Sequence, residues 1–280
     1  MFLIDDQALL ALIREDVPFG DLTTRSLGFG RSRGHLVMAA RDPMTLCAVE
    51  EAARIFELLG CAADLAAASG EARAPGDMIL AAAGSAEALL AGWKVAQVLV
   101  EWAAGLASAA RELVDAATAA RPGVVVACTR KSVPGTRALA LKAVTSGGAT
   151  IHRAGLSDTV LLFPEHRAFA PGCLKGQLMR LRLACPERHI VVEVTHHDEA
   201  LRAAEWGADV VQLEKFAPEA VARVVAELSG SPARVAAAGG ITTANAADYA
   251  ATGADVLVTS SPYHARPRDV AVTLEGVPSS

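Results

Sequence analysis

Residues 124–137 read VVVACTRKSVPGTR, and this stretch combines the features that decide the fold. The β-branched run at its start is typical of a strand buried on both faces, and the Pro134-Gly135 pair turns the chain before a helix-like segment. Arg130, Lys131 and Arg137 therefore gather at the C-terminal end of a strand, beside the start of a helix. Because α/β sheets place anion sites there, the stretch predicts an anionic ligand.

The order of strand, polar loop and helix repeats along the rest of the chain. After the first strand at residues 124–128, further strands are expected at residues 159–163, 190–194, 210–213, 235–238 and 256–259. Short apolar strands that alternate with helices imply a parallel sheet. Polar residues follow nearly every strand, and they meet on one rim only if the sheet curls. We therefore expect an α/β barrel with about six parallel strands rather than a doubly wound sheet.

The first hundred residues mix their element types and do not repeat a βα unit. Their patterns predict helices at residues 6–15, 48–59 and 86–119, and a strand at residues 35–40. A Pro-Phe-Gly-Asp turn follows the first helix, at residues 18–21.

Composition and charge exclude several function classes. The chain has 280 residues, a net charge of -5 and 52% hydrophobic residues, so it lacks the basic balance of a nucleic-acid-binding protein. The five cysteines form no C-x-x-C pair, which indicates reduced residues of a cytoplasmic protein. The N-terminus lacks a basic leader and a small-residue cleavage site, and the longest apolar stretch, residues 95–110, is too short and too polar to span a bilayer. We expect no membrane partner.

A second basic pair, His152 and Arg153, follows the Gly147-Gly148 break. It falls near the expected position of the next strand. Basic loops on neighbouring strand ends predict a small molecule with several negative charges as the ligand.

The basic segments resemble the signature of the quinolinate phosphoribosyltransferase family. The matching positions are Thr129-Arg130-Lys131-x-x-Pro134-Gly135-x-Arg137, Gly147-Gly148-x-x-x-His152-Arg153-x-x-Leu156-x-Asp158 and His166, with Glu15-Asp16, Gly20-Asp21-x-Thr23-Thr24, Val192-Glu193-Val194, Gly239-Gly240 and His264 elsewhere. The resemblance implies an N-terminal α/β sandwich domain, residues 1–108 rejoined by 266–280, and an incomplete α/β barrel, residues 109–265. It also implies a homodimer whose active sites borrow residues from the partner.

Three departures from the family pattern concern the acceptor and donor sites. Lys94 stands where the family has an Arg that reaches across the dimer, and Phe163 stands where the family has a Lys. Glu214 replaces an Asp and keeps its charge at longer reach. With these departures the chain resembles the ModD branch of the family, which is found with molybdenum-uptake genes.

The resemblance and the required chemistry suggest a role for each candidate residue. Loss of pyrophosphate from phosphoribosyl pyrophosphate passes through an oxocarbenium-like state, so a site must neutralise phosphates and tolerate positive charge at the sugar. Lys131, with Arg130 nearby, is expected to hold pyrophosphate. Glu193 and Glu214 are expected to share Mg²⁺ through waters.

The remaining candidates divide between a phosphate and the acceptor. Gly239, Gly240, Ser260 and His264 are assigned to phosphate loops, where backbone N–H groups approach a 5′-phosphate. The expected acceptor residues are Lys94, Arg130, His152, Arg153 and Phe163.

Three functions remain open on the sequence. The first is phosphoribosyl transfer to an anionic acceptor other than quinolinate, or not only quinolinate. The second is quinolinate phosphoribosyltransferase activity, which forms nicotinate mononucleotide in NAD synthesis. The third is a non-enzymatic scaffold that binds an oxyanion such as molybdate. Retained Lys131, Glu193 and Glu214 favour an enzyme, because two acids would weaken a pure anion binder.

Overall fold

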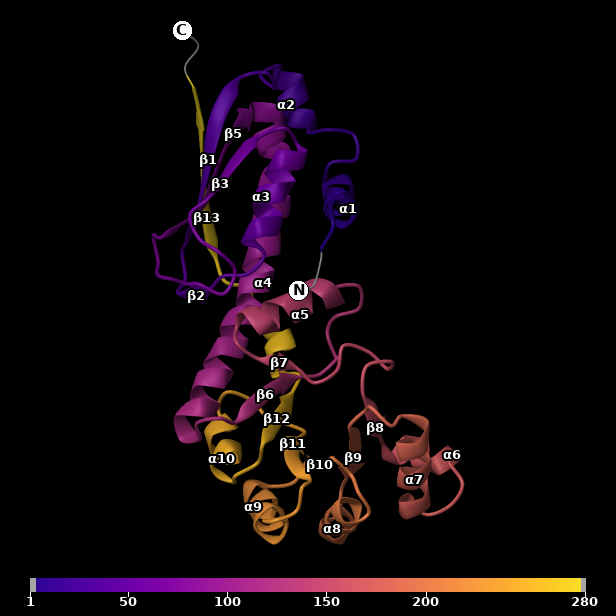
Figure 1. Cartoon of the computed structure of the whole chain (residues 1–280). Coiled ribbons are helices and arrows are strands. Elements are labelled where there is room, and N and C mark those ends of the chain that lie inside the picture. Colours follow the sequence, from indigo (N-terminus) through magenta and orange to yellow (C-terminus); the bar gives the residue numbers. More distant parts are fainter. Residues whose placement is uncertain (1–3, 278–280) are drawn as a thin grey trace. The chain divides into compact units, whose positions relative to one another are not determined.

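The computed structural model describes residues 4–277, which fall into two compact units (Figure 1). Unit 1 comprises the described residues up to 111, residues 133–148 and those from 264 onward, and unit 2 comprises residues 112–132 and 149–263. The expected domains, 1–108 with 266–280 and 109–265, differ most from these units in residues 133–148, which lie with unit 1.

Unit 1 is built on an antiparallel sheet of order β13-β1-β5-β3. Its strands are β1 (Arg33–Ala40), β3 (Ala62–Leu65), β5 (Met78–Ser85) and β13 (Val270–Gly276). Strand β1 alternates buried and more exposed residues, with Leu36, Met38 and Ala40 in the core. The last strand of the chain pairs along β1, with Leu36 opposite Leu274, so the C-terminal segment completes this sheet. A separate pair joins β2 (Met44–Thr45) to β4 (Ala72–Arg73).

Four helices of unit 1 agree closely with the sequence pattern, whereas α2 (Leu22–Leu27) was not predicted. The four are α1 (Asp6–Asp16), α3 (Val49–Leu58), the first part of α4 (Ala86–Ala120) and α5 (Arg137–Ser146). Asp5 and Asp21 cap α1 and α2 through hydrogen bonds from backbone N–H groups. The chain continues through α4 into unit 2.

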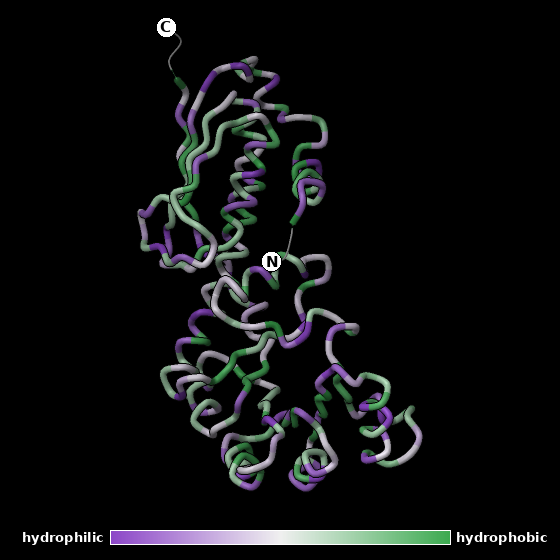
Figure 2. The backbone as a smooth tube through the Cα atoms, viewed as in Figure 1, coloured by the Kyte–Doolittle hydropathy of each residue, from purple (hydrophilic) through white to green (hydrophobic). Residues whose placement is uncertain are grey.

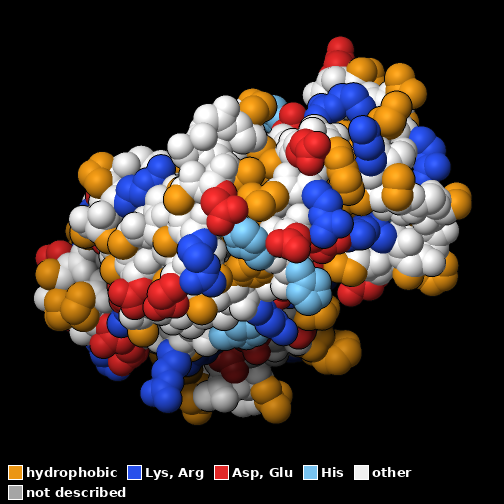
Figure 3. Space-filling model, turned by 90° about the horizontal axis from the view of Figure 1, so that it is seen from below, with side chains coloured by type: hydrophobic (Ala, Val, Ile, Leu, Met, Phe, Trp, Pro, Cys, Tyr) orange, Lys and Arg blue, Asp and Glu red, His pale blue; other side chains and the backbone are white. Residues whose placement is uncertain are grey.

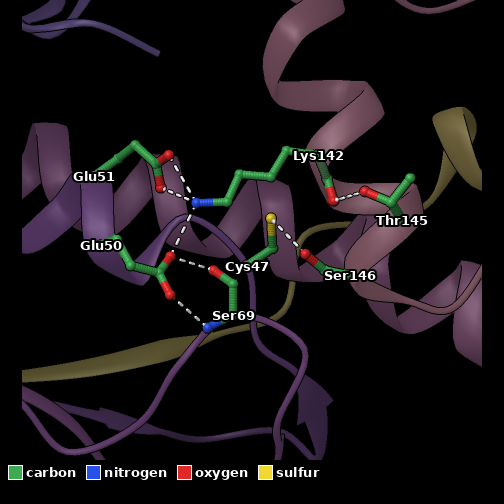
Figure 4. A network of polar contacts seen from close by, with 7 residues as sticks. All are labelled: Cys47, Glu50, Glu51, Ser69, Lys142, Thr145 and Ser146. Carbon is green, nitrogen blue, oxygen red and sulfur yellow. Dashed lines mark hydrogen bonds and ion pairs between the residues drawn. The ribbon is translucent and has the colours of Figure 1, made fainter. Parts of the chain in front are cut away.

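A partly buried ion network joins α3 to α5 within unit 1 (Figure 4). Lys142 Nζ lies 2.6 Å from a Glu51 carboxylate oxygen and 2.9 Å from Glu50 Oε2. Glu50 also accepts hydrogen bonds from the backbone N–H and the hydroxyl of Ser69. Burial alone would raise the pKa of Glu50, but the bonds from Ser69 and Lys142 lower it to about 2.

Unit 2 contains a curled parallel sheet of seven strands, in the order β7-β6-β12-β11-β10-β9-β8. Its strands are β6 (Val125–Cys128), β7 (Thr150–Ile151), β8 (Val160–Leu162), β9 (Ile190–Val194), β10 (Val210–Glu214), β11 (Arg234–Ala238) and β12 (Val256–Thr259). All neighbouring pairs are parallel. Because β7 and β8 lie at the two ends of the order, the barrel is incomplete, and the predicted fold class is confirmed.

Helices follow the strands of this sheet, as the sequence pattern predicts. They are α6 (Pro164–Phe169), α7 (Leu174–Ala184), α8 (His197–Glu205), α9 (Pro218–Glu227) and α10 (Ala246–Ala251), and a short 3₁₀ helix, η1 (Ser261–His264), follows β12. The strands carry mostly hydrophobic residues, coloured green in Figure 2. Val192, Val194 and Leu257 are fully buried, as expected where helices cover a parallel sheet.

Charged side chains are mixed in sign on the face drawn in Figure 3, where basic, acidic and histidine side chains are interspersed with hydrophobic ones. Among residues 4–277, no helix is both long enough and apolar enough to cross a membrane.

Candidate active site

A pocket of about 510 Å³ opens at the carboxyl ends of the unit 2 strands. Ten of the twelve predicted site residues line it: Arg130, Lys131, His152, Arg153, Phe163, Glu193, Glu214, Gly239, Gly240 and Ser260. They come from loops after β6, β7, β8, β11 and β12, and from β9 and β10 themselves. The curled sheet thus brings together side chains that lie more than a hundred residues apart in sequence.

Glu193 and Glu214 provide the negative charge of the pocket. Burial raises the pKa of Glu193, and the nearby carboxylate of Glu214 raises it further. Gln212 works in the opposite direction, because its Nε2 donates a hydrogen bond of 2.7 Å to Glu193 Oε2. Lys131 also favours the ionised form of Glu193. The pocket therefore holds an acidic pair whose charge depends on neighbouring donors.

Arg153 is a buried cation in the same pocket. It is 4% exposed, and its Cζ lies 5.1 Å from the centroid of the Phe163 ring. Within residues 4–277 it forms no ion pair with a carboxylate. Burial and the charge of Arg130 lower its pKa, and the charge of Glu193 partly offsets them, so a bound anion would stabilise the charged guanidinium.

Phe163 also contacts His166 through its ring and its backbone N–H. The two rings stack with centroids 5.7 Å apart, and the Phe163 N–H donates to His166 Nδ1 at 3.1 Å. His152 also lines the pocket, where burial and the charge of Arg153 lower its pKa and an interaction with Gln212 partly offsets them. This half of the pocket combines a cation, an aromatic face and an imidazole that favours its neutral form.

Gly239 and Gly240 form the turn after β11, and both have positive φ, 90° and 78°. Neither N–H has a hydrogen-bond partner among the residues that the structure describes. A Cβ on Gly239 would lie 2.7 Å from Lys215 Cγ, so only glycine fits there. The loop can therefore offer backbone donors to an anion.

Of the pocket residues that are absent from the predicted set, Gln212 and Lys215 are the two that bear on the chemistry. Gln212 is 3% exposed and its Oε1 has no hydrogen-bond partner among the described residues. Its signal in the sequence is a polar residue inside an apolar strand. Lys215 also lines the pocket, directly after β10, and could have been found as a polar residue that follows a strand.

Lys94 and His264 belong to unit 1 and do not line the pocket. Lys94 lies on α4, donates to Gln97 Oε1 at 2.9 Å and stands 4.5 Å from the Trp93 ring centroid. It lines a largely apolar groove in unit 1 that also includes Glu15. Their assignment to the active site stays a prediction.

The acidic pair Glu193 and Glu214 offers fewer ligands than a dedicated metal site does. Among residues 4–277, no group of three or more His, Cys, Asp or Glu side chains is arranged to hold a metal ion. Mg²⁺ often uses only one or two carboxylates and completes its shell with water and substrate phosphates. Glu193 and Glu214 fit that pattern, and they do not form a binding cage of their own.

Comparisons with known proteins agree with this geometry. Residues 21–104 match the quinolinate phosphoribosyl transferase N-terminal domain, and residues 106–273 match the C-terminal domain of the same family. A relative from Rhodobacter capsulatus, named "Putative pyrophosphorylase ModD", is 64% identical over 249 residues, which cover 88% of this chain and 96% of that protein. Rat nicotinate-nucleotide pyrophosphorylase (carboxylating) is 32% identical over 250 residues, 87% of this chain and 83% of the relative.

Solved structures share the fold. The crystal structure of NadC from Streptococcus pyogenes superposes with a TM-score of 0.90 at 25% identity and covers 98% of this chain and 97% of its own. The nicotinate-nucleotide pyrophosphorylase of Ehrlichia chaffeensis gives a TM-score of 0.91 at 21% identity, with 98% and 100% covered.

Proposed function

Because the chain belongs to the quinolinate phosphoribosyltransferase family, a family of pentosyltransferases, we propose that it transfers phosphoribosyl from phosphoribosyl pyrophosphate to an anionic acceptor that is not quinolinate, or not only quinolinate. One observation carries the proposal. A single pocket holds Arg130, Lys131 and Arg153 together with the acidic pair Glu193 and Glu214. Cations match the phosphates, and carboxylates tolerate the positive charge that develops on the ribose.

We assign the pyrophosphate group to the loop after β6. Lys131 and Arg130 are both on this loop, and neither side chain has an ion pair among the described residues. Their charges stabilise the oxygen that carries negative charge as the C1′–O bond breaks. The leaving group is then bound by the same residues that orient it.

Glu193 and Glu214 are the residues that would hold Mg²⁺. The ion would supply charge neutralisation of the departing pyrophosphate. The carboxylates of both residues face the pocket, and ionised Glu193 is aligned by its bond from Gln212. Their negative charge also favours the cationic ribose in the transition state.

The acceptor is assigned to the half of the pocket around Arg153 and Phe163. Arg153 supplies one buried cation for a carboxylate, and the Phe163 ring offers an apolar face to a planar ring. His152 favours its neutral form, so it orients by hydrogen bonding and adds little charge. This composition suits an acceptor with fewer negative charges than quinolinate at the Phe163 edge.

The resemblance to the ModD branch links the reaction to molybdenum utilisation, and this link is part of the proposal. Quinolinate phosphoribosyltransferase activity is the second candidate. It is supported by the rat relative, whose name is that of an enzyme forming nicotinate nucleotide. We also propose a homodimer, in which Lys94 of one copy serves the pocket of the other.

Calorimetric titration with phosphoribosyl pyrophosphate tests the proposal. We expect saturable binding that requires Mg²⁺, and pyrophosphate release when a suitable acceptor is added. A Lys131→Met variant should bind the donor about ten- to a hundredfold more weakly, because one charge-assisted hydrogen bond is lost. If the wild-type protein binds molybdate but not the donor, the enzymatic proposal is wrong and the oxyanion scaffold takes its place.

A further inference from the structure

Lys215 has an unusual backbone conformation for its residue type. Its φ is 59°, and within residues 4–277 the only other non-glycine residue with positive φ is Ala48. A lysine in the left-handed region is strained by its Cβ. Strain of this kind persists where surrounding structure enforces it, and it is concentrated at functional sites.

The surrounding structure shows what enforces the conformation. The Lys215 N–H donates to the Ala238 carbonyl oxygen at 2.7 Å, which ties the end of β10 to the end of β11. A Cβ on Gly239 would lie 2.7 Å from Lys215 Cγ and 3.0 Å from Glu214 Oε1. The Lys215 stem therefore lies directly over the Gly239 backbone, inside the pocket.

The pocket is lined here by three hydrogen-bond donors that have no acceptor among the described residues: the Lys215 ammonium and the N–H groups of Gly239 and Gly240. Among the described residues, Lys215 Nζ forms no hydrogen bond or ion pair, and the N–H groups of Gly239 and Gly240 have no acceptors. An ammonium beside two free backbone donors matches the oxygens of a phosphate monoester. The strained backbone of Lys215 therefore directs its ammonium group toward the pocket.

We propose that Lys215, with Gly239 and Gly240, binds the 5′-phosphate of the ribosyl donor. This inference rests on the proposed function and adds a binding residue to it. Lys131 follows β6 and Lys215 follows β10, with β12 and β11 between them in the sheet. Phosphoribosyl pyrophosphate carries phosphates at both ends of its ribose, so two separate cations suit the two ends. Lys215 holds the monoester and Lys131 the pyrophosphate.

The two ends can be tested with separate probes, ribose 5-phosphate and Mg²⁺-pyrophosphate, by calorimetry. Lys215→Asn removes the ammonium with a residue that tolerates positive φ, and Lys215→Arg retains the charge. We expect Lys215→Asn to weaken ribose 5-phosphate binding about ten- to a hundredfold and to leave pyrophosphate binding within about twofold. Lys131→Met should show the reverse pattern, and Lys215→Arg should restore most of the lost affinity.

Matched controls separate this inference from the proposed function. Lys175→Met removes an exposed lysine of α7 outside the pocket and should change neither affinity. Lys215→Gly relieves the strain, so it should unfold at the wild-type temperature or above while binding ribose 5-phosphate as weakly as Lys215→Asn.

If wild type binds phosphoribosyl pyrophosphate but Lys215→Asn binds ribose 5-phosphate as well as wild type does, the Lys215 assignment alone is wrong. If Lys215→Asn weakens both probes equally, the 5′-phosphate assignment is overturned. If wild type does not bind the donor, the proposed function fails.

Discussion

Gln212 and Glu193 face each other as Cα partners on β10 and β9, and Gln212 Nε2 donates to Glu193 Oε2 at 2.7 Å. The bond stabilises the ionised carboxylate, whereas burial and Glu214 favour the neutral one. The net result is a raised pKa for Glu193. The free enzyme therefore holds Glu193 in an unfavourable charge state, which a bound cation would relieve.

Replacing Glu193 by Gln should separate stability from binding. Because the folded pKa of Glu193 is raised, its protonated carboxyl group contributes stability that is fully present below the unfolded pKa and is lost as the pH rises through the folded pKa. Glu193→Gln avoids that loss, so its melting temperature relative to wild type should increase as the pH rises from about 4 to 7. Thermal melts across this range measure the difference.

The same variant should lose Mg²⁺-dependent protection by phosphoribosyl pyrophosphate, since a ligand stabilises only in proportion to its binding. Glu187→Gln, a change at an exposed carboxylate outside the pocket, is the control and should keep full protection. Full protection in Glu193→Gln would remove Glu193 from the donor site.

The network around Lys142 should contribute measurably to the stability of the fold. The side chains of Lys142 and Glu51 are 16% and 10% exposed, whereas Glu50 is 41% exposed, so removing the ammonium leaves the buried Glu51 carboxylate without its counter-charge. Lys142→Met should cost about 3–5 kcal/mol of unfolding free energy. Urea denaturation at pH 7 provides the measurement.

Arg54 on α3, the helix that carries Glu50 and Glu51, offers a matched control, because it also pairs with two carboxylates, Asp6 and Glu57, but is 44% exposed. Arg54→Met should leave the unfolding free energy close to that of wild type, because solvent screens exposed ion pairs. Equal losses in the two variants would show that burial does not decide the energetics of the Lys142 network.

Much of the fold can be predicted from local sequence pattern. The β-branched runs that end in polar loops gave all strands of the barrel except β7, whose two residues, Thr150 and Ile151, are too short to form a pattern. Similarly, the helix ranges follow from apolar periodicity and from breaks such as the one at residues 121–123.

Pocket residues could be predicted where their position after a strand is enough to place them. Residues just after parallel strands share one rim, which is why Arg130, Glu214 and Gly239 were found. Gln212 was missed because its role depends on the neighbouring strand, where Glu193 is its partner. Lys215 follows β10 and so obeys the same rule of position, but its backbone angle and its close approach to Gly239 are not visible in the sequence.

Mixing two inactive variants should test the shared active site. Lys94 belongs to unit 1, whereas Lys131 lines the pocket in unit 2. If each site combines Lys94 of one copy with Lys131 of the other, a heterodimer of Lys94→Met and Lys131→Met contains one intact site. Subunit exchange between the two variants should therefore restore part of the activity that each lacks. A mixture that stays inactive after demonstrated exchange would contradict the shared site, as would a monomer with full turnover.

Phe163 should decide between the two candidate acceptors. Its ring lies near Arg153, whose Cζ is 5.1 Å from the centroid, and it stacks with the imidazole of His166. A lysine in its place would put an ammonium beside a buried guanidinium, so Phe163→Lys should favour an acceptor with two carboxylates. We expect its kcat/KM for quinolinate to rise about ten- to a hundredfold, the value of one charge-assisted hydrogen bond.

Phe163→Met, which changes shape without adding charge, should bring no such gain. Nucleotide formation from quinolinate measures both variants against wild type. Strong wild-type turnover of quinolinate that Phe163→Lys fails to improve would return the assignment to NAD synthesis.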